Sequence, residues 1–316
     1  MLAPWAHRPP HISWTFDEDR KRKRSTGVER WFGVDWFVDP SRGEWLRRRI
    51  AELDTSGPSG FPAYIRILHP VDAWRPLVVS ESVVTELETE TWSWAHLAAL
   101  NGASLSASSE WWDISGQTDS VDGWTFAKPH DGWVDPHTLA SLVPALRAHT
   151  TTPADVTVAL WEGWGFGASG SPAVLRNDSV ELDAAVVEGD PFVDAKLALM
   201  AASDRSMPER KEPAESIGFP LPRLELPDRR YVLGASSLTE LEDPSWPFRA
   251  GLGWRPGDLD GPTPQLIWPA DHAWCVSTEI DAPYTVVAAS EPLAAVLLDR
   301  PDLETQRVPP PSGAPM

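Results

Sequence analysis

The sequence predicts an α+β fold, in which helices pack on an antiparallel or mixed sheet and long loops join the elements. Strand patterns at residues 265–268, 273–281 and 284–289 follow one another, and a helix pattern follows them. The first half of the chain is richer in helix patterns. Separate runs of helices and strands are typical of α+β domains, whereas regular alternation would indicate a parallel sheet.

The N-terminal region is expected to begin with a flexible arm at residues 1–28. We interpret its basic run, residues 20–24, as a solvated charge block rather than a nucleic-acid patch. A helix is expected at 41–53, because Ser41 and Glu44 have the spacing of a capping box. Alternating apolar residues predict a strand at 63–68.

The middle of the chain mixes clear and unclear patterns. We expect a helix at 91–100 and a helix that opens at Asp135, with Pro136 at its first position and Pro144 inside it. Residues 101–134 lack a period and are expected to form a long irregular region. A buried strand is expected at 156–161 and a turn after it.

The C-terminal half is expected to begin after a proline-rich linker or insertion at 203–228. This linker would separate an N-terminal α+β part, residues 29–202, from a β-rich part, residues 229–304. A strand at 230–234, a short helix at 236–242 and a final helix capped by Ser290 complete the expected elements. Residues 305–316 are expected to form a disordered tail.

Composition limits the function classes. The formal net charge is -19, and between Pro76 and Leu146 the only basic side chain is Lys128. Such a surface disfavours nucleic acid and anionic membranes, and it favours a basic or neutral protein partner. The N-terminus lacks the apolar segment of a secretory signal, and no run of about 18 apolar residues occurs, so we expect a cytoplasmic protein. With one cysteine, no internal disulfide is expected.

Tryptophan is the unusual component, with 18 Trp against 3 Tyr. These rings either form the core, as aromatic residues usually do, or line a binding groove. Trp111, Trp112, Trp124 and Trp133 lie in the irregular acidic region, where core packing explains them least. We expect these four to mark a recognition surface.

Three segments resemble an uncharacterised family of actinobacterial proteins. They are residues 64–70, residues 150–153 with 160–165, and residues 268–281. This resemblance implies membership and a bacterial cytosol, without an activity. The Trp-Gly turns and the order of elements also give a weaker likeness to the SUKH immunity and scaffold proteins.

Candidate chemistry centres on two places. Strand alternation would put Glu279 and Asp281 on one face, about 7 Å apart, as an acid–base pair, a cation site or an ordinary solvated face. Asp271 and His272 precede that strand. Residues 165–170 match the glycine spacing of dinucleotide sites but lack a clear βαβ unit, so we expect a glycine-rich loop and no cofactor. The histidines show no metal-ligand spacing, and no metal is expected.

Two functions remain open from the sequence. The first is a non-catalytic, immunity- or scaffold-like binding protein with an acidic, Trp-rich recognition surface. The second is an enzyme, or a binder of a sugar or aromatic molecule, with a pocket formed by Trp161, Glu162, Trp164 and the strand that contains Glu279. A deep cleft with exposed Trp faces would favour the second function.

Overall fold

The computed structural model describes residues 34, 36, 38–50, 57–80, 83–164, 223–227, 229–250, 252 and 261–311. The expected arm at 1–28, the glycine-rich segment 165–170, most of the expected linker and the last five residues lie outside this part of the chain. No helix in the described ranges is long and apolar enough to cross a membrane.

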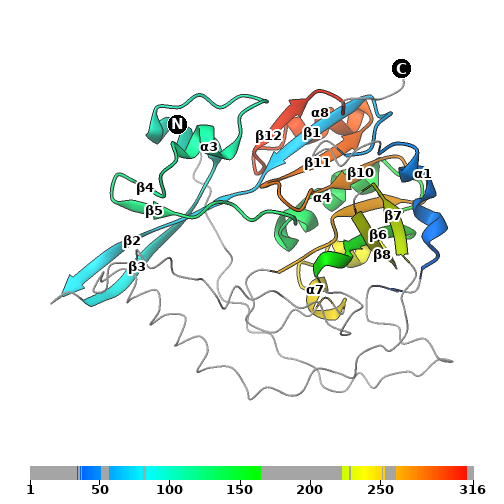
Figure 1. Cartoon of the computed structure of the whole chain (residues 1–316), viewed down its shortest axis with the longest axis horizontal. Helices are drawn as coiled ribbons and strands as arrows, with labels where there is room; N and C mark the ends of the chain where they lie inside the picture. Colours follow the sequence, from blue (N-terminus) through cyan, green and yellow to red (C-terminus); the bar gives the residue numbers. More distant parts are fainter. Residues whose placement is uncertain are drawn as a thin grey trace, which may run out of the picture.

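The fold is α+β, as the sequence predicts, and every strand pairing in the described chain is antiparallel. An eight-stranded sheet has the order β12-β1-β11-β10-β9-β6-β8-β7, and a four-stranded sheet has the order β3-β2-β5-β4 (Figure 1). The strands of the larger sheet are β1 (Ala63–Leu68), β6 (Val156–Trp161), β7 (Arg223–Leu226), β8 (Arg229–Ser236), β9 (Leu266–Pro269), β10 (Cys275–Ser277), β11 (Tyr284–Ala289) and β12 (Thr305–Val308).

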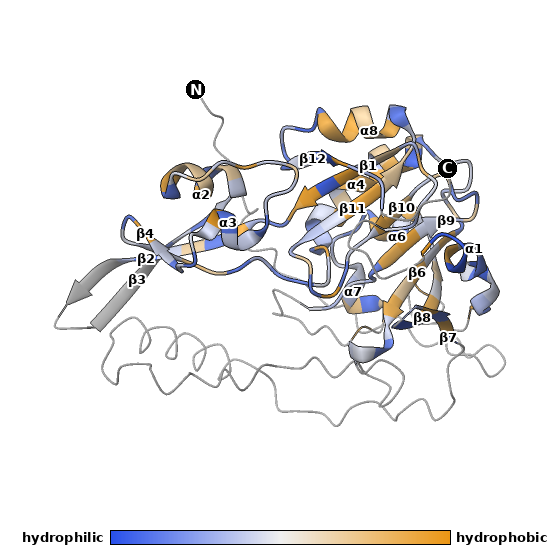
Figure 2. Ribbon diagram, turned by 45° about the horizontal axis from the view of Figure 1, so that its top comes forward, coloured by the Kyte–Doolittle hydropathy of each residue, from blue (hydrophilic) through white to orange (hydrophobic). Residues whose placement is uncertain are grey.

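Both faces of the larger sheet are buried. Along β6, Val158 and Leu160 face one core cluster, while Ala159 between them faces another. Such burial explains why the inner strands β6, β9 and β11 are almost uniformly apolar in sequence (Figure 2). The first cluster lies under the helices α4 (Pro136–Ala148), α6 (Leu238–Leu241), α7 (Trp246–Arg249) and α8 (Glu291–Leu298).

The helix α4 forms as the sequence predicts. The Asp135 carboxylate caps it by accepting hydrogen bonds from the backbone N–H groups of His137 and Thr138, at 2.9 and 3.0 Å. Pro144 lies inside the helix. The predicted inward residues are all fully buried; they are Leu139, Leu142, Val143 and Leu146.

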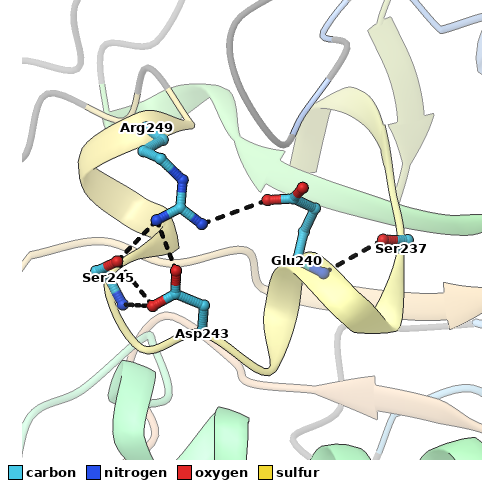
Figure 3. Close-up of polar contacts among 5 residues, drawn as sticks. All are labelled: Ser237, Glu240, Asp243, Ser245 and Arg249. Carbon is cyan, nitrogen blue, oxygen red and sulfur yellow. Dashed lines mark hydrogen bonds and ion pairs between the residues drawn. The ribbon is translucent and has the colours of Figure 1, made fainter. Parts of the chain in front are cut away.

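The α6–α7 turn is fixed by its own polar residues (Figure 3). Arg249 donates to Asp243 and to the hydroxyl of Ser245, both at 2.7 Å, and reaches Glu240 at 3.3 Å. Burial acts to raise the pKa of Asp243, but hydrogen bonds from Ser245 and Arg249 outweigh it and lower that pKa. Every charge in this turn therefore has a partner.

The smaller sheet and two helices form a separate projection, here called the acidic lobe and defined as residues 71–126. Its β2–β3 hairpin extends away from the larger sheet (Figure 1). Its elements are β2 (Val71–Ser80), β3 (Val83–Trp92), α2 (Trp94–Asn101), α3 (Trp111–Ser115), β4 (Ser120–Val121) and β5 (Trp124–Phe126). Rings packed edge to face hold it together: the Trp92–Trp124 and Trp94–Trp111 centroids are each 5.4 Å apart.

The lobe joins the larger sheet through the C-terminal segment. The carboxylate of Glu304 accepts the backbone N–H groups of Trp94 and Ala95 at 2.6 and 2.7 Å, where α2 begins. Arg66 in β1 donates to the backbone oxygens of Ser106 and Ser109, both at 3.2 Å. The lobe is therefore fixed to β1 and to the segment before β12.

Four predicted elements differ from the structure. The expected helix at 41–53 is a 3-10 turn, η1 (Pro40–Gly43), followed by the short α1 (Glu44–Arg47). The side chain of Asp39, not Ser41, provides the cap. The helix expected at 91–100 begins at Trp94 instead, because Trp92 ends β3. The strand expected at 273–281 is only β10, and the region 101–134 contains a helix and two short strands.

The expected division into two parts also differs from the structure. Residues 223–226, placed in a linker by the sequence, form the edge strand β7. Residues 305–308, placed in a disordered tail, form β12 and pair with β1. Both are edge strands, so their polar alternation hides their place in the sheet. Strands from both sides of the expected boundary belong to one sheet.

Candidate functional site

The four tryptophans expected to form one surface lie in different environments. Trp111 and Trp124 are buried in the core of the lobe, with 3% and 9% exposure. Trp133 is half-buried and lies outside the lobe. Trp112 is 60% exposed. The expectation of a shared surface is therefore wrong for Trp111 and Trp124, which pack against aromatic neighbours.

Trp112 is exposed because of its position on α3. The Asp113 carboxylate accepts the backbone N–H of Glu110 at 2.9 Å and helps to cap this short helix. Helical spacing then turns Trp111 and Ile114 into the core and leaves Trp112 and Asp113 in solvent. Trp112 is the most exposed large apolar side chain of the described residues.

The surface around Trp112 is acidic. The lobe sequence contains nine acidic residues and one basic residue, Arg75. Arg75 is already engaged, since it forms an ion pair with Glu88 at 2.5 Å and stacks on Trp124 at 4.5 Å. The acids exposed in the described lobe are Asp72, Glu90, Glu110, Asp113, Asp119 and Asp122.

A second group of predicted residues does come together, at the β6–β8 end of the larger sheet. We call it the Trp–Arg cluster, and it comprises Trp133, Trp161, Glu162, Trp164, Arg229 and Glu279. Its rings form a chain: Trp133 lies 5.2 Å from Trp164, and Trp164 lies 5.5 Å from Trp161, both edge to face. The sequence predicted that Trp161, Glu162, Trp164 and Glu279 share a site, and the structure brings them together.

Gln265 holds this cluster on the sheet. Its buried side chain accepts the backbone N–H of Trp161 at 2.7 Å and donates to the oxygen of Gly132 at 2.8 Å. Gly132 has φ +86, and a Cβ there would lie 2.8 Å from the Ile280 oxygen and 3.0 Å from the Trp164 ring. Only glycine fits this approach without strain, so the loop before α4 packs closely on the cluster.

Arginines neutralise the carboxylates of the cluster. Arg229 donates to Glu279 at 2.8 Å and reaches Asp281 at 4.0 Å. Arg223 and Arg230 both contact Glu162, at 2.6 and 2.8 Å. These arginines were not predicted as site residues, although Arg230 begins the strand predicted at 230–234 and Arg229 precedes it.

A hollow of about 550 Å³ lies beside the cluster. Its lining residues are Trp161, Glu162, Gly163, Glu225, Leu226, Arg229 and Arg230. The hollow is open, and the Trp161 ring is covered within it. The Arg229 guanidinium lies 5.5 Å from the ring centroid, and Gly163 approaches so closely that a Cβ would lie 2.1 Å from the ring.

The expected acid pair does not form a shared catalytic face. Glu279 is held by Arg229 with 11% of its side chain exposed, whereas the side chain of Asp281 is 86% exposed. The alternative of an ordinary solvated strand face is also wrong. On that face, Cys275 is buried in the second core cluster, and Ser277 is also buried.

Asp271 and His272 lie at the other end of β10 from Glu279. Burial acts to raise the pKa of Asp271, but hydrogen bonds from Thr151 and Thr150 outweigh it and lower that pKa. His272 has φ +53 and stacks on Trp45 at 4.5 Å. Both residues fix a turn, so they do not contribute to the Trp–Arg cluster.

Two reactive side chains are buried away from both surfaces. Burial raises the pKa of the Cys275 thiol, which has no exposed surface. Burial lowers the pKa of His69 to about 4. Its Nδ1 donates to the His130 oxygen at 2.8 Å, because a carbonyl can only accept, and its Nε2 accepts from the Thr285 hydroxyl at 2.9 Å. His69 is therefore a neutral, fully bonded core residue.

In the described part of the chain, no three His, Cys, Asp or Glu side chains converge as metal ligands. Comparison of the chain with protein-family models, with curated proteins and with solved structures gave no match in any of the three.

Proposed function

We propose that the chain is a non-catalytic cytoplasmic binding protein, immunity- or scaffold-like, that contacts a basic protein partner through the acidic lobe. The observation that carries this proposal is Trp112, 60% exposed on a lobe with nine acids and one arginine. A tryptophan with a polar rim has the composition of a binding anchor, because aromatic residues are enriched and the rim is polar in protein interfaces.

The chemistry of this surface selects the partner. Tryptophan is enriched among the residues that contribute most to binding, because a rigid ring buries much area at a small entropic cost. Surrounding carboxylates attract lysine and arginine, accelerate association and repel phosphate backbones. We therefore propose a basic protein as the partner and expect no binding of nucleic acid.

The experiment measures binding of a lysine-rich peptide to the full chain by titration calorimetry, beside a glutamate-rich peptide of equal length. Only the lysine-rich peptide should bind, and binding should weaken with salt. Trp112→Ala should weaken it by about 2 kcal/mol or more. Val296→Ala shortens a 42% exposed side chain of α8 and is the matched control. It should leave the binding free energy of the peptide unchanged.

A charge-reversal pair tests the electrostatic part. Asp119→Lys, on the lobe, and Asp299→Lys, at the end of α8, alter net charge equally and both sites are exposed. Only Asp119→Lys should slow the association of the lysine-rich peptide with the chain. Equal effects would show that net charge, not the lobe, attracts the peptide, and would defeat the proposal.

The hollow beside the Trp–Arg cluster supports a second candidate function, the binding of a small polar molecule such as a sugar. Arg230 has a 63% exposed side chain, so it is the lining residue that would exchange its ion pair with Glu162 for such a ligand. The covered face of Trp161 and the arginine partners of both glutamates make this candidate the weaker one. A sugar panel that changes tryptophan fluorescence in the parent but not in Arg230→Ala would support it.

A further inference from the structure

The strand β3 is the edge of the four-stranded sheet. It spans ten residues and pairs with β2 on one side only. No residue in the described ranges hydrogen-bonds to its outer side along positions 88–92. The hairpin also extends away from the larger sheet (Figure 1), so none of the strands of that sheet pairs with this edge.

The direction of the main-chain groups on this edge follows from the register. The Asp72 oxygen accepts the N–H of Ala127 at 2.9 Å, so the polar groups of Asp72 face β5 and not β3. Its cross-strand partner Thr91 is therefore in a non-hydrogen-bonded pair, as is Thr89 two residues earlier. Thr89 and Thr91 consequently direct their N–H and C=O groups outward.

Side chains next to this edge indicate what fits it. Glu88 and Glu90 lie on one face of β3, and Thr89 and Thr91 lie on the other. Glu90 is exposed, and Glu88 forms an ion pair with Arg75, the single arginine of the lobe. A second copy of β3, paired antiparallel, would place glutamates opposite glutamates, which is destabilising.

We propose that an extended, lysine- or arginine-rich segment of the partner adds as a strand to the β3 edge, bonding Thr89 and Thr91 and placing its basic side chains beside Glu88 and Glu90. This inference rests on the proposed function and names its binding mode. Strand addition obtains affinity from main-chain hydrogen bonds and selectivity from alternate side chains.

The test uses an alternating Lys-Thr peptide of about ten residues, the length of a typical long strand. Thr89→Pro removes one outward N–H and leaves the β2 ladder intact, because proline is tolerated where the N–H faces solvent. Thr89→Val keeps the N–H and is the matched control. The proline variant should bind the peptide about tenfold more weakly than the valine variant, since a main-chain bond is lost and the ring obstructs its neighbour.

Amide exchange by NMR gives an independent measurement on the unmodified chain. Peptide binding should slow exchange at Thr89 and Thr91 more than at any other lobe amide. Equal affinity of the proline and valine variants, without protection of these amides, would overturn strand addition. So would concentration-dependent dimerisation that protects the same amides without peptide, because the occupant would then be a second copy.

The outcomes separate this inference from the proposed function. If Trp112→Ala abolishes peptide binding while Thr89→Pro does not, the acidic lobe binds basic partners by another mode. If no lysine-rich peptide binds at all, both proposals fail together.

Discussion

Protonation of His69 should destabilise the folded chain in mild acid. The imidazole is fully buried, lies where β1 passes into β2, and has a pKa of about 4 against an ordinary value of 6.5. Between these values the unfolded chain binds a proton that the folded chain does not, so stability is fully present above about pH 6.5 and is lost as pH falls toward about 4. The complete loss corresponds to about 3 kcal/mol, and roughly 2 kcal/mol of it should appear at pH 5.

The assay is urea unfolding of the parent chain and of His69→Asn at pH 7 and pH 5. Asparagine keeps an N–H group toward the His130 oxygen but cannot take up a proton. The variant should be less stable at pH 7, and its deficit should shrink by about 2 kcal/mol at pH 5. Comparing the two chains cancels the carboxylates that titrate in both.

His137→Asn is the matched control, because His137 is exposed on the first turn of α4. Any change in its stability difference from the parent between pH 7 and pH 5 is subtracted from the change that His69→Asn shows. The reasoning about His69 is refuted if the deficit of His69→Asn is the same at both pH values, since the buried imidazole would then carry no cost of protonation.

Five further substitutions test the packing and the ion pairs. Trp111→Ala should cost about 3–5 kcal/mol of unfolding free energy by leaving a cavity in the lobe, whereas Trp112→Ala should stay within about 0.5 kcal/mol in the same urea titration. Gly132→Ala should lower the melting temperature measurably, because its φ of +86 and the 2.8 Å approach to a backbone oxygen leave no room for a Cβ. Arg229→Ala should lower the free energy of unfolding by about 3 kcal/mol, because it leaves the largely buried carboxylate of Glu279 unpaired. Arg230→Ala should lower it by less than about 1 kcal/mol, because the Arg230 side chain is exposed. Equal values for the two variants would refute this.

Elements with a complete local signal were predictable from the sequence. The segment from Asp135 into α4 combines a cap, a first-position proline and a regular apolar stripe. Ser290 likewise caps α8 by accepting from the N–H of Leu293, and Tyr284–Ala289 forms a strand with the predicted bounds. In each case the signal that predicts the element lies in neighbouring residues, although β11 also pairs with the distant strand β1.

The β2–β3 hairpin was missed because Pro76 interrupts the pattern of β2, and because β3 alternates glutamate with threonine at residues 88–91. An edge strand with glutamate on one face and threonine on the other resembles a loop in composition, so apolar periodicity does not reveal it. β10 ends at Ser277, two residues before Glu279, although the N–H of Thr278 still donates to the oxygen of Gln265 at 2.8 Å.

The candidate site was predicted only in part, for a similar reason. Trp161, Glu162 and Trp164 are adjacent in sequence, so their association is local. Their arginine partners come from β7 and β8, far along the chain, and ion pairs between distant residues leave no periodic pattern. The burial of Trp111 also depends on a helix too short to show a stripe.

The position of β1 has a consequence for synthesis of the chain. Its two neighbours in the sheet are β11 and β12, and the contact between Arg66 and Gln306 joins residues 240 positions apart. At ribosomal rates of about 5–20 residues per second, β1 waits about 10–50 s with both edges unpaired. During that interval the nascent chain exposes an apolar strand to other chains, so its yield should depend on chaperones more than its native stability suggests.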